Sequence, residues 1–191
     1  LIFIIYLFCS IPKSYFLLLI SYVSLSLTYS RSTFLSLAII AFITGKYLKK
    51  PLLGPLVTAL VIVTILLLPR FPGEGTKLER DSSIRDKIVN YQEGIALFSQ
   101  HPFAGVGYDN LPFVRTSFKP TSHAISGFDS SLLTILTTTG ILGFVPFVIG
   151  LYQLFITSTT TRKIALIAVL IHSLFANSLL YPWILIFLAL I

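Results

Sequence analysis

Two charged side chains, Arg31 and Asp129, stand at the edges of apolar runs, where a charge is costly and therefore points to chemistry. An arginine is permanently charged and can fork onto two oxygens of an anion, so Arg31 is a candidate binding cation. The Asp129 carboxylate could act as a general base or orient a hydroxyl group, or it could simply cap a helix. His123, six residues earlier, is a second candidate base. Arg31 could also be an interfacial anchor, and His123 an ordinary surface histidine.

A glycine pair, Gly105 and Gly107, lies in the segment from His101 to Asn110. Paired glycines permit a tight turn or a close approach of the backbone to a ligand, so both are candidate ligand-binding positions. No buried strand precedes them, and they are therefore not a dinucleotide-binding fingerprint. His101 precedes a proline and is interpreted as a turn residue.

The sequence predicts neither a metal site nor another cofactor. Its His, Cys, Asp and Glu residues show no zinc-ligand spacing, and no paired glutamates suggest a carboxylate metal site. A glycine-rich loop ending in Lys-Ser or Lys-Thr is absent, so coupling to ATP within this chain is not expected. The single Cys9 cannot form a disulfide within the chain.

The composition indicates a membrane protein. Hydrophobic residues make up 55% of the chain and charged residues 11%, whereas soluble domains contain about 25% charged residues. Four uncharged apolar runs are each about long enough to cross a bilayer, and we therefore expect an all-α, polytopic transmembrane helix bundle. These runs are residues 14–30, 52–69, 131–156 and 164–181. Further candidate spans are residues 1–11 and 183–191, which are truncated, and residues 32–48, where only 32–45 are free of charge.

The distribution of charge predicts the orientation. If Lys13 is cytoplasmic, alternation of the spans places Arg31 outside and makes residues 70–128 one large extracytoplasmic loop. The basic residues of the other short connections fall on the side of Lys13: Lys46, Lys49, Lys50, Arg162 and Lys163. All seven acidic residues lie in this loop or at its edge, next to seven basic ones, so the net charge of +7 comes from the remaining chain. The basic character therefore reflects membrane topology and gives no reason to expect a nucleic acid partner.

Three regions follow from this topology: transmembrane helices in 1–69, the loop in 70–128, and transmembrane helices in 129–191. The chain contains no Met and begins and ends inside apolar runs, so we expect a fragment of a longer protein whose first and last helices are truncated.

The loop is expected to contain an amphipathic helix over about 83–99. Ser83 to Asp86 fits a capping box at its start. Apolar side chains then recur at helical spacing at Ile84, Ile88, Tyr91, Ile95 and Phe98. We expect this face to lie on the membrane surface or to pack against the bundle.

Three stretches, in this order, carry a resemblance to a known family. The first is Leu27-Thr-Tyr-Ser-Arg-Ser-Thr33, at the end of a span. In the second, Tyr91 stands ten positions before His101-Pro, which Gly105-Val-Gly follows. The third is Asp129-Ser, nine residues, and Gly140-Ile-Leu-Gly. Together they resemble the C-terminal part of the O-antigen ligase and polymerase family of bacterial membrane glycosyltransferases. That family has a histidine where this sequence has Asp129.

The resemblance implies transfer of a glycan from an undecaprenyl-diphosphate-type lipid carrier to an acceptor hydroxyl on the outer face of the cytoplasmic membrane. The implied partners are this lipid-linked donor, a lipid, glycan or protein acceptor, and the bilayer itself. Arg31 would stabilise the charge of the departing diphosphate. Arg85 or Lys87 would correspond to the basic position of the loop helix and bind the diphosphate or glycan together with Gly105 and Gly107. Either Asp129 or His123 would replace the family histidine.

Two alternatives remain at this point. A transporter or flippase of lipid-linked glycans would place ionisable residues within its spans, whereas here the charges gather in one loop. An inactive, structural membrane protein that has lost the histidine is the second alternative. For Arg85, an exposed salt bridge to Asp81 is an alternative to a catalytic role. His172 and Asn177 are expected to make polar contacts between helices.

Overall fold

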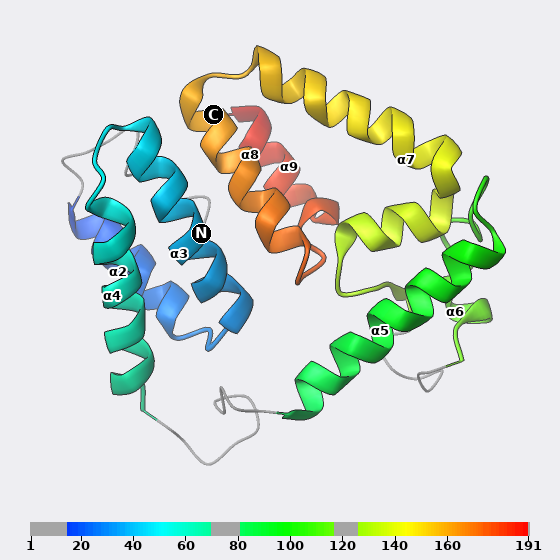
Figure 1. Ribbon diagram of the computed structural model, residues 1–191, viewed down its shortest axis with the longest axis horizontal. Helices are drawn as coiled ribbons and strands as arrows, with labels where there is room; N and C mark the ends of the chain where they lie inside the picture. The colour runs from blue at the N-terminus through cyan, green and yellow to red at the C-terminus, as the bar shows by residue number, and fades with distance from the viewer. Residues whose placement is uncertain (1–14, 70–80, 117–125, 191) are drawn as a thin grey trace. The chain divides into compact units, whose positions relative to one another are not determined.

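The computed structural model describes residues 15–69, 81–116 and 126–190, and His123 therefore lies outside the described residues (Figure 1). Every regular element within these ranges is a helix, which confirms the all-α prediction. The chain divides into two compact units. Unit 1 comprises Leu1–Arg80, Thr159–His172 and Leu188–Ile191, and unit 2 comprises Asp81–Ser158 and Ser173–Phe187.

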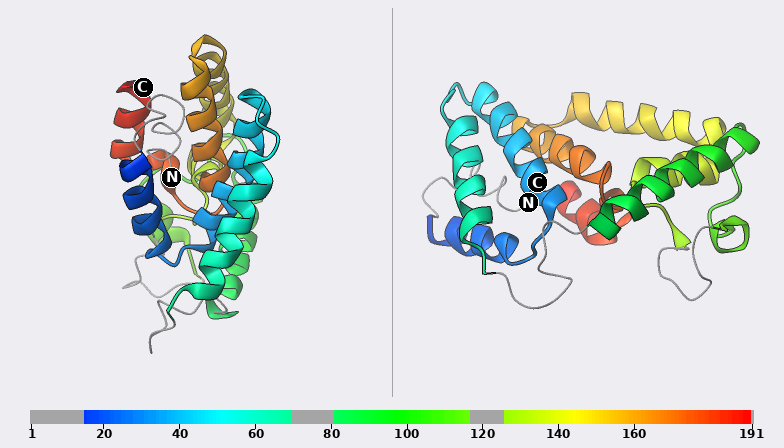
Figure 2. Two further views of the ribbon diagram at one scale, coloured as in Figure 1. Left: turned by 90° about the vertical axis from the view of Figure 1, so that its left-hand side faces the viewer. Right: turned by 60° about the horizontal axis from the view of Figure 1, so that its bottom comes forward.

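Unit 1 is built from α2, α3, α4 and most of α8, and its blue to cyan helices are seen again in Figure 2. The bounds are Tyr15–Ser26 for α2, Arg31–Tyr47 for α3, Leu53–Leu67 for α4 and Thr160–Ser173 for α8. The first three coincide with the runs predicted over 14–30, 32–48 and 52–69. A close approach of α3 and α4 depends on Gly54, because a Cβ atom there would overlap the Phe42 ring.

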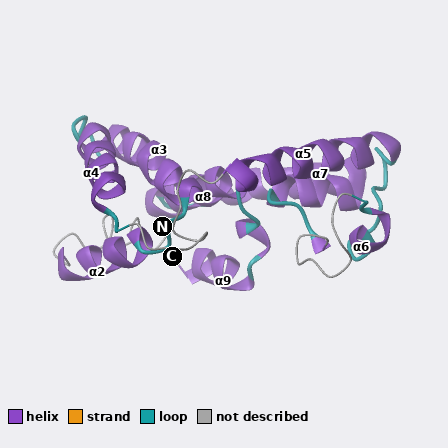
Figure 3. Cartoon of the chain, turned by 90° about the horizontal axis from the view of Figure 1, so that it is seen from below, coloured by secondary structure: helices purple, strands orange, loops and turns teal. Residues whose placement is uncertain are grey.

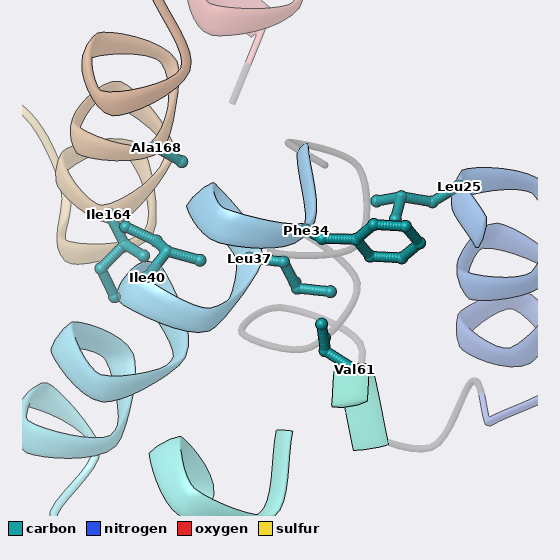
Figure 4. Packing of buried hydrophobic residues seen from close by; sticks show 7 residues of the cluster. All are labelled: Leu25, Phe34, Leu37, Ile40, Val61, Ile164 and Ala168. Atoms are coloured by element: carbon teal, nitrogen blue, oxygen red, sulfur yellow. The ribbon is translucent and has the colours of Figure 1, made fainter. Parts of the chain in front are cut away.

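The core of unit 1 consists of apolar side chains from all four of these helices (Figure 4). Phe34, Leu37 and Ile40 recur every three residues and therefore share one face of α3. They pack with Leu25, Val61, Ile164 and Ala168. Hydrogen bonds also link these helices, such as the one between Tyr22 Oη and Thr64 Oγ1 at 2.6 Å.

Unit 2 is organised around α5 and α7, which lie side by side in Figure 3. The bounds are Asp81–Gln100 for α5, Leu111–Val114 for α6, Ser131–Thr157 for α7, Ser178–Leu180 for the 3-10 helix η3, and Pro182–Leu190 for α9, which begins in this unit. Four buried apolar side chains form its core: Leu97, Leu111, Phe128 and Leu133.

The apolar face predicted for α5 is only partly packed within unit 2, where Tyr91 lies against the core. Ile84, Ile88 and Ile95 are exposed, whereas Asn90 and Leu97 are buried. The reason is Gly94, which lies on the buried side, where a Cβ atom would overlap Leu133 of α7. The small residue lets the two helices approach closely, and the apolar stripe is left beside the contact. The helix begins at Asp81, two residues before the predicted capping box.

Helix α7 is broken at Gly140, whose φ of 61° and ψ of −167° are not helical, and Figure 1 shows the bend. The segment after α5 fills the break with backbone hydrogen bonds. Ile141 and Leu142 donate to the carbonyls of Pro102 and Phe103, at 2.9 and 3.1 Å. The carbonyls of Thr137 and Thr138 accept from Val106 and Gly107, at 3.0 and 2.9 Å. Two of the carbonyls and two of the N–H groups released by the break are therefore satisfied by this segment.

Among the described helices, α7 is long and apolar enough to cross a membrane, and α2 and α4 are apolar but shorter. The run predicted as one span over 164–181 is not one helix, because α8 ends at Ser173 and η3 follows. Carbonyls in the intervening turn accept hydrogen bonds from side chains of α5 and α7, as described below. The multi-span topology and the extracytoplasmic position of 70–128 stay predictions.

Candidate functional site

Asp129 lies at the start of α7 and is held by two residues of α5. Asn90 Nδ2 donates to Asp129 Oδ2 at 3.1 Å, and Lys87 Nζ lies 3.8 Å from the same oxygen. The side chains of Lys87 and Asp129 are 36% and 37% exposed, so the pair is accessible from solution. The N-cap of α7 is Ser130, whose Oγ accepts from Leu133 N at 3.3 Å. The Asp129 carboxylate is therefore not the capping group of α7, and its role as a base stays a prediction.

A turn that follows α8 closes the site on the side of Lys87. Its Nζ donates to the carbonyl of Phe175 at 2.6 Å, and Tyr91 Oη donates to the carbonyl of Leu174. Ser131 Oγ donates to the carbonyl of Ala176 and accepts from Leu179 N. These bonds restrict Lys87 to the neighbourhood of Asp129.

Behind Asn90 lies a residue that the sequence did not single out, Arg115. Its side chain is fully buried and forms an ion pair with Glu93, whose side chain is 9% exposed. Arg115 Nε and Nη2 both donate to Glu93 Oε2, at 3.0 and 2.8 Å. The guanidinium also donates to Asn90 Oδ1 and to the carbonyl of Gly127, and its Cζ lies 4.5 Å from the Phe128 ring centroid.

Sequence reasoning missed Arg115, Asn90 and Glu93 because no spacing rule links them. Asn90 and Glu93 fall outside the apolar stripe of α5, which normally indicates a solvated face. Arg115 is 22 residues from Glu93, in a segment without periodicity. A buried asparagine and glutamate one helical turn apart are recognised only once the packed face is known.

The structure distinguishes between the two candidate cations of α5. Lys87 lies beside Asp129, whereas the Arg85 side chain is exposed. The side chain of Asp81 lies outside the described residues, so its predicted salt bridge with Arg85 stays a prediction.

Gly105 and Gly107 hold the segment that fills the break in α7. Both have positive φ, 67° and 93°, which favours glycine. A Cβ atom at Gly105 would overlap the backbone of Thr138. This close approach is to the protein's own backbone, and it explains the pair structurally. Binding of a substrate by these glycines stays a prediction.

Arg31 belongs to unit 1, where it is the first residue of α3 and half-buried. The N-cap Ser30 accepts at its Oγ from Thr33 Oγ1 at 2.8 Å. Thr33 Oγ1 also lies 3.1 Å from His172 Nε2 of α8. His172 thus makes the polar contact between helices that the sequence predicted. A cation beside the positive end of a helix dipole forms an environment that favours an anion.

Within the described ranges, no three His, Cys, Asp or Glu side chains come together in a way that could hold a metal ion. His101 is exposed at the end of α5, and its carbonyl accepts from Gly105 N at 3.1 Å. This position agrees with its interpretation as a turn residue.

Comparison with known proteins supplies the family. A family model described as O-antigen ligase matches residues 16–148, which is well over half of the chain. The match runs from α2 through α6 and over residues 131–148 of α7, and it therefore includes Arg31, Lys87, Asn90, Arg115 and Asp129. Searches of curated proteins and of solved structures found no match. On the strength of the family match, this chain belongs to the O-antigen ligase family, a family of membrane proteins that carry out ligase- or polymerase-type glycan transfer.

Proposed function

We propose that the protein transfers a glycan from a polyprenyl-diphosphate carrier of the undecaprenyl type to an acceptor hydroxyl on the outer face of the cytoplasmic membrane. The bond between the anomeric carbon and the diphosphate oxygen breaks, and a bond forms between that carbon and the acceptor oxygen. The diphosphate leaves on its lipid, and the acceptor proton passes to a base. No metal or cofactor is needed for this balance, because the donor is already activated.

The observation that carries the proposal is the Asp129 carboxylate, which stands at the position where the family has a histidine. It is accessible, it is not used as the helix cap, and Asn90 and Lys87 hold one of its oxygens. A carboxylate fixed in this way can accept the hydroxyl proton. Lys87, at the neighbouring position, can bind an oxygen of the glycan or diphosphate as that proton moves.

Arg31 is proposed to stabilise the negative charge of the departing diphosphate. Its place at the first residue of α3 supports this role, because a guanidinium and the amides of a helix start both attract anions. Gly105 and Gly107 remain candidate donor-binding positions, and His123 remains an alternative base. The acceptor is a lipid, a growing glycan or a protein hydroxyl, and the site chemistry is the same for all three.

The test uses the full-length protein in cells that lack the chromosomal gene. Asp129→Ala and Arg31→Ala should each lower surface glycan linkage or chain extension by about 100-fold or more, while the amount of protein in the membrane is unchanged. Gln92→Ala, on an exposed position of α5, is the matched control and should retain activity.

Full activity of both Asp129→Ala and Arg31→Ala would contradict the proposed mechanism. Loss in Arg31→Ala with full activity in Asp129→Ala would transfer the role of base to His123, which His123→Ala then tests. In the deletion strain, the glycan conjugate that disappears as the lipid-linked donor accumulates identifies the acceptor. Failure of the donor to accumulate would contradict glycan transfer altogether.

A further inference from the structure

We propose that Arg115 is a positioning residue that acts through Asn90, fixing the direction of the Asn90 amide so that it donates to the Asp129 carboxylate. This inference rests on the proposed function, in which Asp129 is the base. Arg115 itself is buried and does not touch the substrate.

The burial of Arg115 is unusual for an arginine. Its side chain has no exposed surface, and an isolated buried guanidinium would be strongly destabilising. The ion pair with Glu93 compensates its charge, and Thr116 N donates to the other Glu93 oxygen at 2.8 Å. The Gly127 carbonyl and the Phe128 ring complete its surroundings. Arg115 therefore has one orientation, and the segment that carries Asp129 is fastened to it through residues 127 and 128.

The direction of the hydrogen bonds made by Asn90 fixes the orientation of its side-chain amide. A guanidinium can only donate, so the group of Asn90 that faces Arg115 must be its carbonyl oxygen. The amide nitrogen then has to point the other way, and it points at Asp129 Oδ2. An ionised carboxylate can only accept, and the two ends therefore demand the same amide orientation. With an exposed fraction of 4%, Asn90 has little access to water as an alternative partner.

Exposure to solvent increases along a chain of contacts, here called the relay, that joins Glu93, Arg115, Asn90, Asp129 and Lys87. Glu93, Arg115 and Asn90 are inside the protein, whereas Asp129 and Lys87 at its end are each exposed by more than a third. The charges alternate and cancel, with two carboxylates and two cations. Because the relay is neutral overall and rigid at its buried end, the Asp129 carboxylate at its exposed end is held in place where a substrate can reach it.

The experiment measures glycan transfer by the full-length protein in proteoliposomes, with the polyprenyl-diphosphate-linked glycan and acceptor extracted from cells lacking the gene. Asn90→Ala removes the bond to Asp129, and Arg115→Lys keeps the charge opposite Glu93 but lacks the fork needed to hold Asn90 as well. We expect Asn90→Ala to lower kcat about tenfold with the KM of the donor unchanged within about twofold, since it loses one hydrogen bond to a charged group. Arg115→Lys should lower kcat about threefold, because the Asn90 amide loses its fixed direction.

The decisive measurement is the double variant. If Arg115 acts through Asn90, Asn90→Ala with Arg115→Lys should have the kcat of Asn90→Ala alone. Independent structural damage would instead multiply the two losses, to about thirtyfold, and would overturn the inference. Gln92→Ala again serves as the control on α5.

The outcomes also separate this inference from the proposed function. Loss of transfer in Asp129→Ala with full kcat in Asn90→Ala would overturn the positioning role and leave the function intact. Full activity of Asp129→Ala would remove the base assignment itself, and with it the role given to Asn90 and Arg115.

Discussion

Unit 1 and unit 2 each have an apolar core, but unit 2 adds a buried ion pair and backbone bonds across a helix break. The core of unit 1 is formed by apolar side chains from α2, α3, α4 and α8. In unit 2, the buried ion pair of Arg115 and Glu93 and the backbone bonds across the break in α7 join segments distant in the sequence. Apolar contacts tolerate exchange of one side chain for another of similar volume, whereas a buried polar group requires its own partner. Replacing a buried polar residue should therefore lower the free energy of unfolding more in unit 2 than in unit 1. Function should also depend more directly on the buried polar residues of unit 2.

The largest effect on stability should come from Arg115→Met. It leaves the Glu93 carboxylate buried without its cation, and we expect the free energy of unfolding to fall by about 3–5 kcal/mol. Denaturant titration of the protein in detergent micelles measures this change. The double variant with Glu93→Gln should recover a large part of the loss, because no unpaired charge remains. A loss below about 1 kcal/mol for Arg115→Met would show that the ion pair does not stabilise unit 2.

The next effect concerns the break in α7. Gly140→Ala forces an alanine to φ of 61° and brings its Cβ against the carbonyl of Phe103, so we expect a loss of about 3 kcal/mol. Gly150→Ala is the matched control in the same helix, because a Cβ there meets nothing within 4 Å. It should be neutral or stabilise by up to about 1 kcal/mol, since alanine favours a helix over glycine. Equal effects of the two substitutions would mean that the break at Gly140 is not required.

The smallest expected change in the free energy of unfolding comes from replacing a buried serine, and one serine in each unit allows a comparison. Ser131 Oγ in unit 2 donates to the Ala176 carbonyl and accepts from Leu179 N, whereas Ser36 Oγ in unit 1 has no hydrogen-bond partner among the described residues. We expect Ser131→Ala to cost about 1–2 kcal/mol and Ser36→Ala to be neutral or slightly stabilising, by the same denaturant titration. A larger loss for Ser36→Ala would contradict the distinction between the units.

Much of the helical content could be predicted from the sequence, because helix formation follows from local periodicity and run length. The predicted runs over 14–30, 32–48 and 52–69 correspond to α2, α3 and α4, and the predicted helix over 83–99 corresponds to α5. The end of α8 at Ser173, inside the run over 164–181, could not be predicted, because no local sequence signal stops the helix there. Its end depends on carbonyl partners supplied by Lys87, Tyr91 and Ser131, which are distant in sequence.

The candidate site was predictable where a residue type is unusual for its position. Asp129 was recognised because it stands at the start of an apolar run where the family has histidine. Gly105 and Gly107 were recognised because glycine pairs mark special backbone geometry, although the structure gives them a contact with α7 rather than showing one with a ligand. No such signal existed for Arg115, whose importance comes entirely from what surrounds it.

By itself, the sequence determined that this chain is helical, that its charges gather in one region, and that Arg31 and Asp129 are candidate site residues. These conclusions need only composition, periodicity and local chemistry. Only the tertiary structure decided that Lys87 rather than Arg85 meets Asp129. Residues two positions apart on a helix point about 200° apart, and the packing of the helix selects which of them faces the site. The tertiary structure also joined Asp129 through Asn90 to the buried Arg115 and Glu93, since contacts between distant segments depend on how the helices pack.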